Sequence, residues 1–431
     1  MFMNNSSDIF NWLMHFVNFE RTPSRKLFRL ETMLSLASFV DHPERFAPVI
    51  HIAGSKGKGS VTGMIAAMLE AAGMKTARYH SPHVSDYRER IMSGTGFFPE
   101  EVYLDAGAEL VGAVEAYSAP EPLTFFELMT LYFFLCARRA CVDCVVVETG
   151  MGGRLDATNI VDPLLSVITL IELEHTAYLG NTLAAIAGEK AGIIKPKKPL
   201  VLAEQEAQAL AVFQKAASTL SSPLYYFPDH AHITDIRLSA AGTDFTFTLH
   251  ERSHELHTAL PGAVQAYNAG LAVLAATLAY PDIGDQAIYA GLSGFTLPAR
   301  FERIKDDPVV IVDGAHTPQS IRHCLDTFAA IYGSGHSLVF GCAADKDTLS
   351  LARILLPYFS HIIITRPGTF KESFPQKVYE IFKHELSCGQ ELLLVEETGA
   401  ALQKAIELDQ PVLGTGSFYL AAELISYVRS A

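Results

Sequence analysis

The sequence VIHIAGSKGKGS, at residues 49–60, joins an apolar segment to a glycine-rich turn. Residues 49–53 have the length and apolar character of a short buried strand. The turn is followed by apolar residues at helical spacing, and Gly73 comes where a left-handed residue would end that helix. The sequence therefore predicts strand, turn and helix in succession; the apolar positions of the helix are Val61, Met64, Ile65, Met68 and Leu69.

The turn is a shortened relative of the Walker A pattern, with one residue fewer between its glycines. Glycines let the backbone N–H groups converge on phosphate oxygens, and the helix N-terminus adds positive potential. An ordinary glycine turn is the alternative, but the strand–turn–helix context favours ATP. Lys58 is expected to meet the β- and γ-phosphates, whereas Lys56 could be merely solvated. The expected nucleotide contacts are Gly54, Ser55, Gly57, Lys58, Gly59 and Ser60.

Further strands alternate with helical segments, which predicts an α/β fold with a mostly parallel sheet. Residues 142–148 and 165–171 are apolar strands, whereas 232–260 has the alternation of antiparallel hairpins. We expect a P-loop-type ATPase domain with a small antiparallel extension over residues 1–297. A smaller Rossmann-like α/β domain should follow over residues 298–431, with strands near 309–312, 338–340, 362–365, 392–395 and 412–413.

Composition excludes several classes of protein. The 431 residues include 33 Lys and Arg against 47 Asp and Glu, a formal charge of −14, and 49% are hydrophobic. A long disordered chain and a general nucleic-acid binder are therefore disfavoured. No apolar run is long enough to span a bilayer, and residues 1–20 lack the basic start of a secretory signal. Six cysteines fit a cytoplasmic protein, and the Cys141-Cys144 pair suits a structural role better than a redox or zinc site.

Glu148 ends the strand at 142–148 and is the first candidate metal ligand. A carboxylate at a strand end beside a phosphate loop is well placed to hold Mg²⁺, although it could also simply face water. The glycines that follow it allow a ligand to approach the backbone closely. Arg154 and Asp156 could clamp a substrate carboxylate or shape this loop.

Lys190 lies on the apolar stripe of a helix predicted from Thr182 to Ile194. Burying an ammonium group costs several kcal/mol unless it is paired. The side chain could extend to solvent, pair with Glu174 or Glu189, or lose its proton and add carbon dioxide to become a carbamate ligand for Mg²⁺. Periodicity alone favours extension to solvent.

Several motifs together resemble the folylpolyglutamate synthase/dihydrofolate synthase family of the Mur ligase superfamily, from about residue 45 to the C-terminus. The longest is Glu148–Asn159, which reads ETGMGGRLDATN. Three positions differ from the usual family pattern: Glu174 replaces Asp, Ala299 replaces Gly and Thr317 replaces Asn. The other matching segments are residues 54–60, 81–83, 174–176, 189–193, 298–301, 313–316 and 416–419.

The resemblance implies an enzyme that joins L-glutamate to a folate or dihydropteroate carboxylate with ATP and two Mg²⁺ ions. It implies that Lys190 is carbamylated, which reverses the ranking from periodicity. The implied metal ligands are Ser60, Ser81, Glu148, His175 and Lys190. The implied nucleotide contacts beyond the loop are Asn268, Arg300 and Asp313, and the implied acid-substrate contacts are Thr124, Phe125, Phe126, Arg154, Leu155 and Asp156.

The expected reaction passes the γ-phosphoryl group of ATP to the acid, and the amine of glutamate then displaces phosphate. Lys58, Lys190 and His316 are the candidate catalytic residues, although His316 could instead line the nucleotide or glutamate site. We expect a monomer that binds neither nucleic acid nor membrane. A cell-wall Mur ligase and a nucleotide-binding protein without ligase activity are the competing hypotheses.

Two other clusters allow more than one interpretation. His250, His254 and His257 resemble a metal cluster by number but fit a solvated hairpin better. The segment 345–347, Asp-Lys-Asp, could approach glutamate or ATP, or could be a charged turn.

Overall fold

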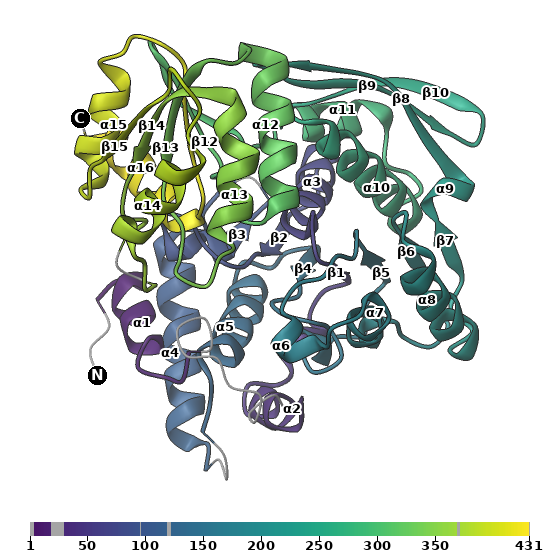
Figure 1. Ribbon diagram of the computed structural model, residues 1–431. Helices are drawn as coiled ribbons and strands as arrows, with labels where there is room; N and C mark the ends of the chain where they lie inside the picture. The colour runs from purple at the N-terminus through teal and green to yellow at the C-terminus, as the bar shows by residue number, and fades with distance from the viewer. Residues whose placement is uncertain (1–3, 19–29, 95, 119–121, 369–370, 431) are drawn as a thin grey trace.

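The computed structural model describes residues 4–18, 30–94, 96–118, 122–368 and 371–430. Three sheets organise these residues, one of seven strands, one of three and one of six. In Figure 1 the C-terminal helices and strands, green to yellow, lie beside the purple to teal elements of the first domain.

The large sheet has the order β3-β2-β4-β1-β5-β6-β7, with β1 at its centre. All neighbouring pairs are parallel except β2 with β3 at one edge. The expected mostly parallel sheet is therefore confirmed. Its strands are β1 (Val49–Ala53), β2 (Thr76–Tyr79), β3 (Ile91–Ser93), β4 (Cys144–Glu148), β5 (Leu165–Ile168), β6 (Leu200–Leu202) and β7 (Leu224–Tyr226).

Helices cover both faces of this sheet, because its central strands are apolar on both sides. Val49 faces one core with α1 (Ser6–Leu13), α2 (Leu30–Ser38), α4 (Glu100–Ala116) and α5 (Phe125–Arg139). Ile50 and Ile52 face the other, with α3 (Lys58–Ala71), α10 (Ala263–Ala279) and α11 (Asp285–Gly294). A third core packs β5 and β6 against α7 (Leu183–Lys190) and α8 (Ala207–Thr219).

The antiparallel segment forms a sheet of its own and does not join the large one. It consists of β8 (Ala231–Ser239), β9 (Gly242–Leu249) and β10 (Arg252–Thr258). Phe245 and Phe247 of β9 are fully buried in the core that contains α10, so the small sheet covers that helix. The predicted hairpins are present, and their packing explains why residues 231–258 belong with the first domain.

The C-terminal sheet has the order β11-β12-β16-β13-β14-β15, and only its edge strand β11 runs antiparallel. The proposed junction at 297/298 lies in the turn between α11 and β11. The strands are β11 (Glu302–Asp306), β12 (Val309–Val312), β13 (His336–Phe340), β14 (Phe359–Ile364), β15 (Glu391–Leu394) and β16 (Val412–Thr415). Their helices are α12 (Pro318–Tyr332), α13 (Thr348–Leu355), α14 (Pro375–Glu385), α15 (Thr398–Ile406) and α16 (Phe418–Ser430).

Several predicted elements are shorter than expected. The strand expected at 165–171 ends at Ile168, and the helix expected from Thr182 to Ile194 ends at Lys190 and continues as a 3₁₀ turn. Thr182 is its N-cap, as predicted, and accepts a hydrogen bond from the Ala185 N–H. In the described part of the chain, no helix combines the length and apolar character that a bilayer crossing requires. The remaining short helices are α6 (Thr176–Leu179) and α9 (Phe227–His230).

Candidate active site

The candidate site is built at the carboxyl ends of four neighbouring strands. Parallel strands bring their carboxyl ends to one edge of a sheet, where α/β proteins bind ligands. The phosphate loop follows β1 and Glu148 ends β4, while His80 follows β2 and Thr169 follows β5. The order β2-β4-β1-β5 makes these four segments neighbours.

The phosphate loop is closely packed on both sides. Gly54 has φ +154°, and a Cβ there would lie 1.8 Å from Thr169 Oγ1. Gly57 has φ +86°, in the left-handed region, and a Cβ there would lie 2.3 Å from Asn268 Oδ1. Both positions therefore require glycine. The contact also places Asn268 of α10, a predicted nucleotide contact, beside the loop.

The N-terminus of α3 points out of this loop without a side-chain cap. Gly57 is its N-cap residue and offers no side chain to the first N–H groups of the helix. Such N–H groups form a site for anions, because they carry the positive end of the helix dipole. Lys58 Nζ donates to the Gly54 carbonyl at 3.0 Å, which holds the ammonium group against the loop. This geometry suits a phosphate chain.

Glu148 lies against the same loop. A Cβ on Gly59 would lie 3.5 Å from Glu148 Oε2, and the Glu148 side chain is buried. The same carboxylate oxygen is 3.2 Å from His80 Nδ1. Sequence analysis missed His80, because the four-residue strand β2 that precedes it was not predicted. Burial lowers the pKa of His80 although the hydrogen bond to Glu148 opposes this, so His80 is neutral and donates its Nδ1–H.

Lys190 is buried, and its side chain is only 1% exposed. The prediction from periodicity that it extends to solvent is therefore wrong. Its Nζ donates to the Gly54 carbonyl at 2.6 Å and to Glu174 Oε1 at 3.0 Å. Burial, together with a smaller effect from the charge of Lys58, lowers its pKa to about 8, although Glu174 opposes both effects. Lys190 thus has the pairing that burial demands, at the back of the phosphate loop.

Glu189, the other acid considered for Lys190, pairs with Arg154 instead, at 2.9 Å. Glu174 remains ionised beside Lys190. Its burial raises its pKa, but the charges of Lys58 and Lys190 outweigh burial and lower it.

His175 is exposed and has φ +47° at the start of α6. Ser60 is buried and Ser81 is half-buried. Within the described ranges, no three His, Cys, Asp or Glu side chains converge as they would around a metal ion. A Mg²⁺ ion bound by Glu148 would therefore need hydroxyl and phosphate oxygens as further ligands, which are the ligands that Mg²⁺ accepts.

The loop after Glu148 folds back on itself and rests on the helix of Lys190. Asp156 Oδ2 accepts from the Met151 N–H at 2.9 Å, which closes the loop. The Arg154 N–H donates to the Glu189 carbonyl at 2.7 Å. Asn159 Nδ2 donates to both the Arg154 and the Gly192 carbonyls, at 3.1 and 3.0 Å. The loop and the segment that carries Lys190 are thereby joined.

The predicted acid-substrate segment borders this loop. A Cβ on Gly150 would lie 2.4 Å from the Phe126 ring, so Phe126 lies beside the loop. Phe125 is buried in the core. Thr124 is buried and caps α5, where its hydroxyl donates to Glu127 Oε2 at 2.7 Å. Leu155 is 37% exposed.

The residues at the junction between the two domains, Arg300 and Asp313, have defined contacts. The Arg300 guanidinium lies 4.5 Å from the centre of the Phe418 ring. Asp313 accepts from the Phe301 and Ala315 N–H groups, at 2.8 and 2.7 Å. Burial raises the pKa of Asp313, against the opposing charge of Arg300. The carboxylate therefore fixes the junction to the loop after β12.

His316 lies in that loop, with its Nδ1 2.8 Å from the Gly314 carbonyl. The carbonyl can only accept, so Nδ1 carries the proton. Burial lowers the pKa of His316 to about 4, although this hydrogen bond opposes the shift. Thr317 is the N-cap of α12 and accepts from the Ser320 N–H. Ala299, where relatives have glycine, has φ +53°, in the region that favours glycine.

The other sequence clusters have contacts of their own. All six cysteines are free, with Cys141 exposed and Cys144 buried, which agrees with the structural interpretation of the pair. His254 and His257 face different acids, Asp285 and Asp244. In segment 345–347, Asp347 caps α13.

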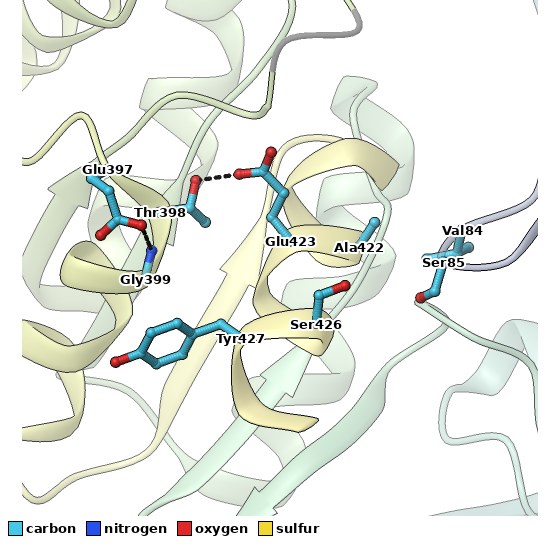
Figure 2. A pocket seen from close by; sticks show the side chains of 9 residues that line it. All are labelled: Val84, Ser85, Glu397, Thr398, Gly399, Ala422, Glu423, Ser426 and Tyr427. Carbon is cyan, nitrogen blue, oxygen red and sulfur yellow. Dashed lines mark hydrogen bonds between the residues drawn. The ribbon is translucent and has the colours of Figure 1, made fainter. Parts of the chain in front are cut away.

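Figure 2 shows a separate cavity of about 320 Å³, between the loop at 84–85 and helices α15 and α16. None of its lining residues is a predicted site residue. Its carboxylates are already engaged: Glu397 accepts from the Gly399 N–H at 2.9 Å, and Glu423 accepts from the Thr398 hydroxyl at 2.6 Å.

Comparison with known proteins gives family matches to both parts of the chain. The Mur ligase middle domain matches residues 52–276, and the Mur ligase glutamate ligase domain matches residues 299–418. A folylpolyglutamate synthase of Lacticaseibacillus casei is 32% identical over 90% of this chain and 92% of its own length. A dihydrofolate synthase/folylpolyglutamate synthase of Bacillus subtilis is 35% identical, over 76% and 78%.

A solved complex of a folylpolyglutamate synthase with AMPPCP and folate has a TM-score of 0.83 and 29% identity, covering 97% of this chain and 98% of that one. The two domain matches lie on either side of the junction, and the relatives extend along nearly the whole chain. The chain therefore belongs to the Mur ligase family, in its group of folylpolyglutamate and dihydrofolate synthases.

Proposed function

We propose that this chain is an ATP-dependent ligase that joins L-glutamate to the carboxylate of a folate or of dihydropteroate. The names of its relatives carry these two activities, and one neighbour binds an ATP analogue and folate together. The observation that carries the proposal is the meeting of the phosphate loop with Glu148, Asn268 and Lys190 at one sheet edge.

The reaction has two steps. An acid oxygen attacks the γ-phosphorus of ATP, the bond to the bridging oxygen breaks, and ADP leaves with the electron pair. The glutamate amine then attacks the acyl carbon, phosphate leaves, and the nitrogen loses a proton to solvent. The N–H groups of α3 and the ammonium of Lys58 are positioned to bind the phosphates, where charge develops.

The donor set fits magnesium. Glu148 is buried beside the loop, and the first turn of α3, which contains the Ser60 hydroxyl, adjoins it. Ser60, Ser81 and Glu148 would hold one ion, and His175 with Lys190 would hold the second. Bound Mg²⁺ supplies positive charge to the phosphoryl oxygens. His80 donates to Glu148 and so fixes the orientation of that carboxylate.

Lys190 would serve as a ligand only after carbamylation. With a pKa of about 8, about a tenth of its side chains are neutral at pH 7. The neutral amine attacks the carbon of CO₂, a C–N bond forms, and a proton leaves to solvent. Labelling with ¹³CO₂ tests this, with a carbamate resonance expected in wild type and absent in Lys190→Met.

Phosphate release tests the function. Release should require glutamate together with dihydropteroate or a reduced folate, and omission of either should reduce it to background. Release on a cell-wall sugar-nucleotide precursor instead would support a cell-wall Mur ligase. ATP hydrolysis that ignores all acids would support a nucleotide-binding protein without ligase activity.

A further inference from the structure

A chain of buried side chains runs from the centre of the large sheet to the loop at 150–156. It starts at His51, in the middle of β1, whose side chain is fully buried. His51 Nε2 lies 2.8 Å from Thr158 Oγ1. Thr158 Oγ1 in turn lies 2.6 Å from Asp156 Oδ1.

The direction of these hydrogen bonds follows from the number of protons. The Asp156 carboxylate can only accept, so the single hydroxyl proton of Thr158 points to Asp156. The Thr158 oxygen must then accept from His51, and the proton of His51 is on Nε2. If Nε2 accepted instead, two lone pairs would face each other across 2.6 Å at Asp156. His51 is neutral, because burial lowers its pKa to about 3, with a smaller effect from the charge of Lys195.

Asp156 connects the His51–Thr158 hydrogen bonds to the loop. Its Oδ1 also accepts from the Thr158 N–H at 3.0 Å, and its Oδ2 accepts from the Met151 N–H at 2.9 Å. Both carboxylate oxygens are thus fixed, and with them the position of Met151. The neighbouring Gly150 is the residue against which the Phe126 ring packs.

Packing alone does not account for His51. Its Nδ1 is buried and, among the described residues, has no hydrogen-bond partner. A buried polar atom without a partner costs free energy, which an apolar side chain of similar size would avoid. The unpaired Nδ1 indicates that histidine is needed at position 51 for the hydrogen bond that its Nε2–H donates to Thr158.

We propose that His51 and Thr158 are positioning residues for the acid substrate. They act through Asp156, which holds the loop at 150–154 in the shape that receives the acid beside Phe126. The proposal rests on the proposed function, because it takes this loop to border the folate or dihydropteroate.

Paired substitutions test the proposal. Thr158→Val removes the hydroxyl at nearly constant volume, and Thr158→Ser keeps it; His51→Leu removes the donor, and His51→Gln keeps one. Thr158→Val and His51→Leu should each raise KM for dihydropteroate or tetrahydrofolate about tenfold, the effect of losing one hydrogen bond. KM for ATP should change less than about twofold. The conservative variants Thr158→Ser and His51→Gln should retain an acid KM close to that of wild type.

The control is Thr243→Val. Thr243 is a buried threonine of β9, in the separate three-stranded sheet, and its hydroxyl donates to the Leu260 carbonyl. This variant should change neither KM. An unchanged acid KM in Thr158→Val, or equal increases in both KM values, would overturn the proposal.

A spectroscopic measurement serves as a second test that needs no activity. Selective ¹⁵N labelling of histidine should show His51 with a protonated Nε2 and an unprotonated Nδ1 in the wild-type protein. A proton on Nδ1 would contradict the proposal even if a variant failed to fold. Inactivity of the wild-type enzyme on every folate would count against the proposed function and leave this result unaffected.

Discussion

Lys190 Nζ lies 3.0 Å from Glu174 Oε1, although the Lys190 side chain is only 1% exposed. The contact joins a lysine at the end of α7 to an acid in the segment after β5. It places a charged pair directly behind Gly54 of the phosphate loop, since the same Nζ also donates to the Gly54 carbonyl.

Glu174→Gln should lower the free energy of unfolding by about 3–5 kcal/mol, because it leaves a buried ammonium without its counter-charge. Glu189→Gln is the matched control. The Arg154 side chain that pairs with Glu189 is 54% exposed, so the decrease in the free energy of unfolding should stay below about 0.5 kcal/mol. Urea denaturation of both variants measures the difference, and equal losses would contradict the buried pair.

Lys58→Ala should abolish turnover and leave the protein folded. The ammonium group contributes charge to the phosphates but fills no core position, so stability should change little. Phosphate release and circular dichroism measure the two effects, and Lys215→Ala on the exposed face of α8 is the control. A Lys58→Ala enzyme with wild-type kcat would remove the phosphate-loop assignment.

Gly57→Ala should raise KM for ATP more than tenfold, an effect above about 1.4 kcal/mol. The new methyl group would collide with Asn268 and the residue would remain in left-handed backbone. Gly73→Ala has the same backbone cost, with φ +91°, but nothing within 4 Å of the new Cβ. It should therefore lose about 1 kcal/mol of stability without a change in KM.

His51 should make the protein sensitive to acid. Its folded pKa of about 3 is below the ordinary value of 6.5, so its stabilising contribution is complete above pH 6.5 and is lost as the pH falls towards 3. The stability difference between wild type and His51→Gln should narrow by about 2 kcal/mol from pH 7 to pH 5. A constant difference across this range would show that His51 titrates normally.

Thr317→Ala should lower stability by about 1 kcal/mol through loss of the α12 cap, and Thr317→Asn should not. Thermal unfolding measures both. Thr317 departs from the asparagine usual in relatives, and its place at the helix start explains why either residue serves: both can cap. A catalytic defect in Thr317→Asn without loss of stability would show that the side chain does more than cap.

The central part of the site could be predicted from sequence because it depends on strand ends. The apolar segment 49–53 and the strand that ends at Glu148 are both strong local patterns, and a parallel sheet brings such ends together. The pattern could not reveal His80. Its strand has four residues and includes Thr76 and Arg78, so it lacks the apolar run that marks β1 and β4.

Contacts between residues distant in the sequence were the second part of the site that could not be predicted. Periodicity placed Lys190 on an apolar stripe correctly, and Glu174 was one of its two possible partners. The sequence could not choose between Glu174 and Glu189, because Glu174 lies 16 residues away in a different segment. The pairing of β8, β9 and β10 was visible as hairpins, whereas their packing against α10 depends on contacts between distant parts of the chain. Such contacts leave no local pattern in the sequence.

The two hydrogen bonds of Asn159 have a practical consequence. They connect the loop that we propose receives the acid to the segment after Lys190, at the Arg154 and Gly192 carbonyls. A small molecule that displaced this loop would therefore also shift the segment that carries Lys190. An inhibitor designed against the proposed acid-binding loop should therefore also alter the phosphate-binding side of the site without contacting it.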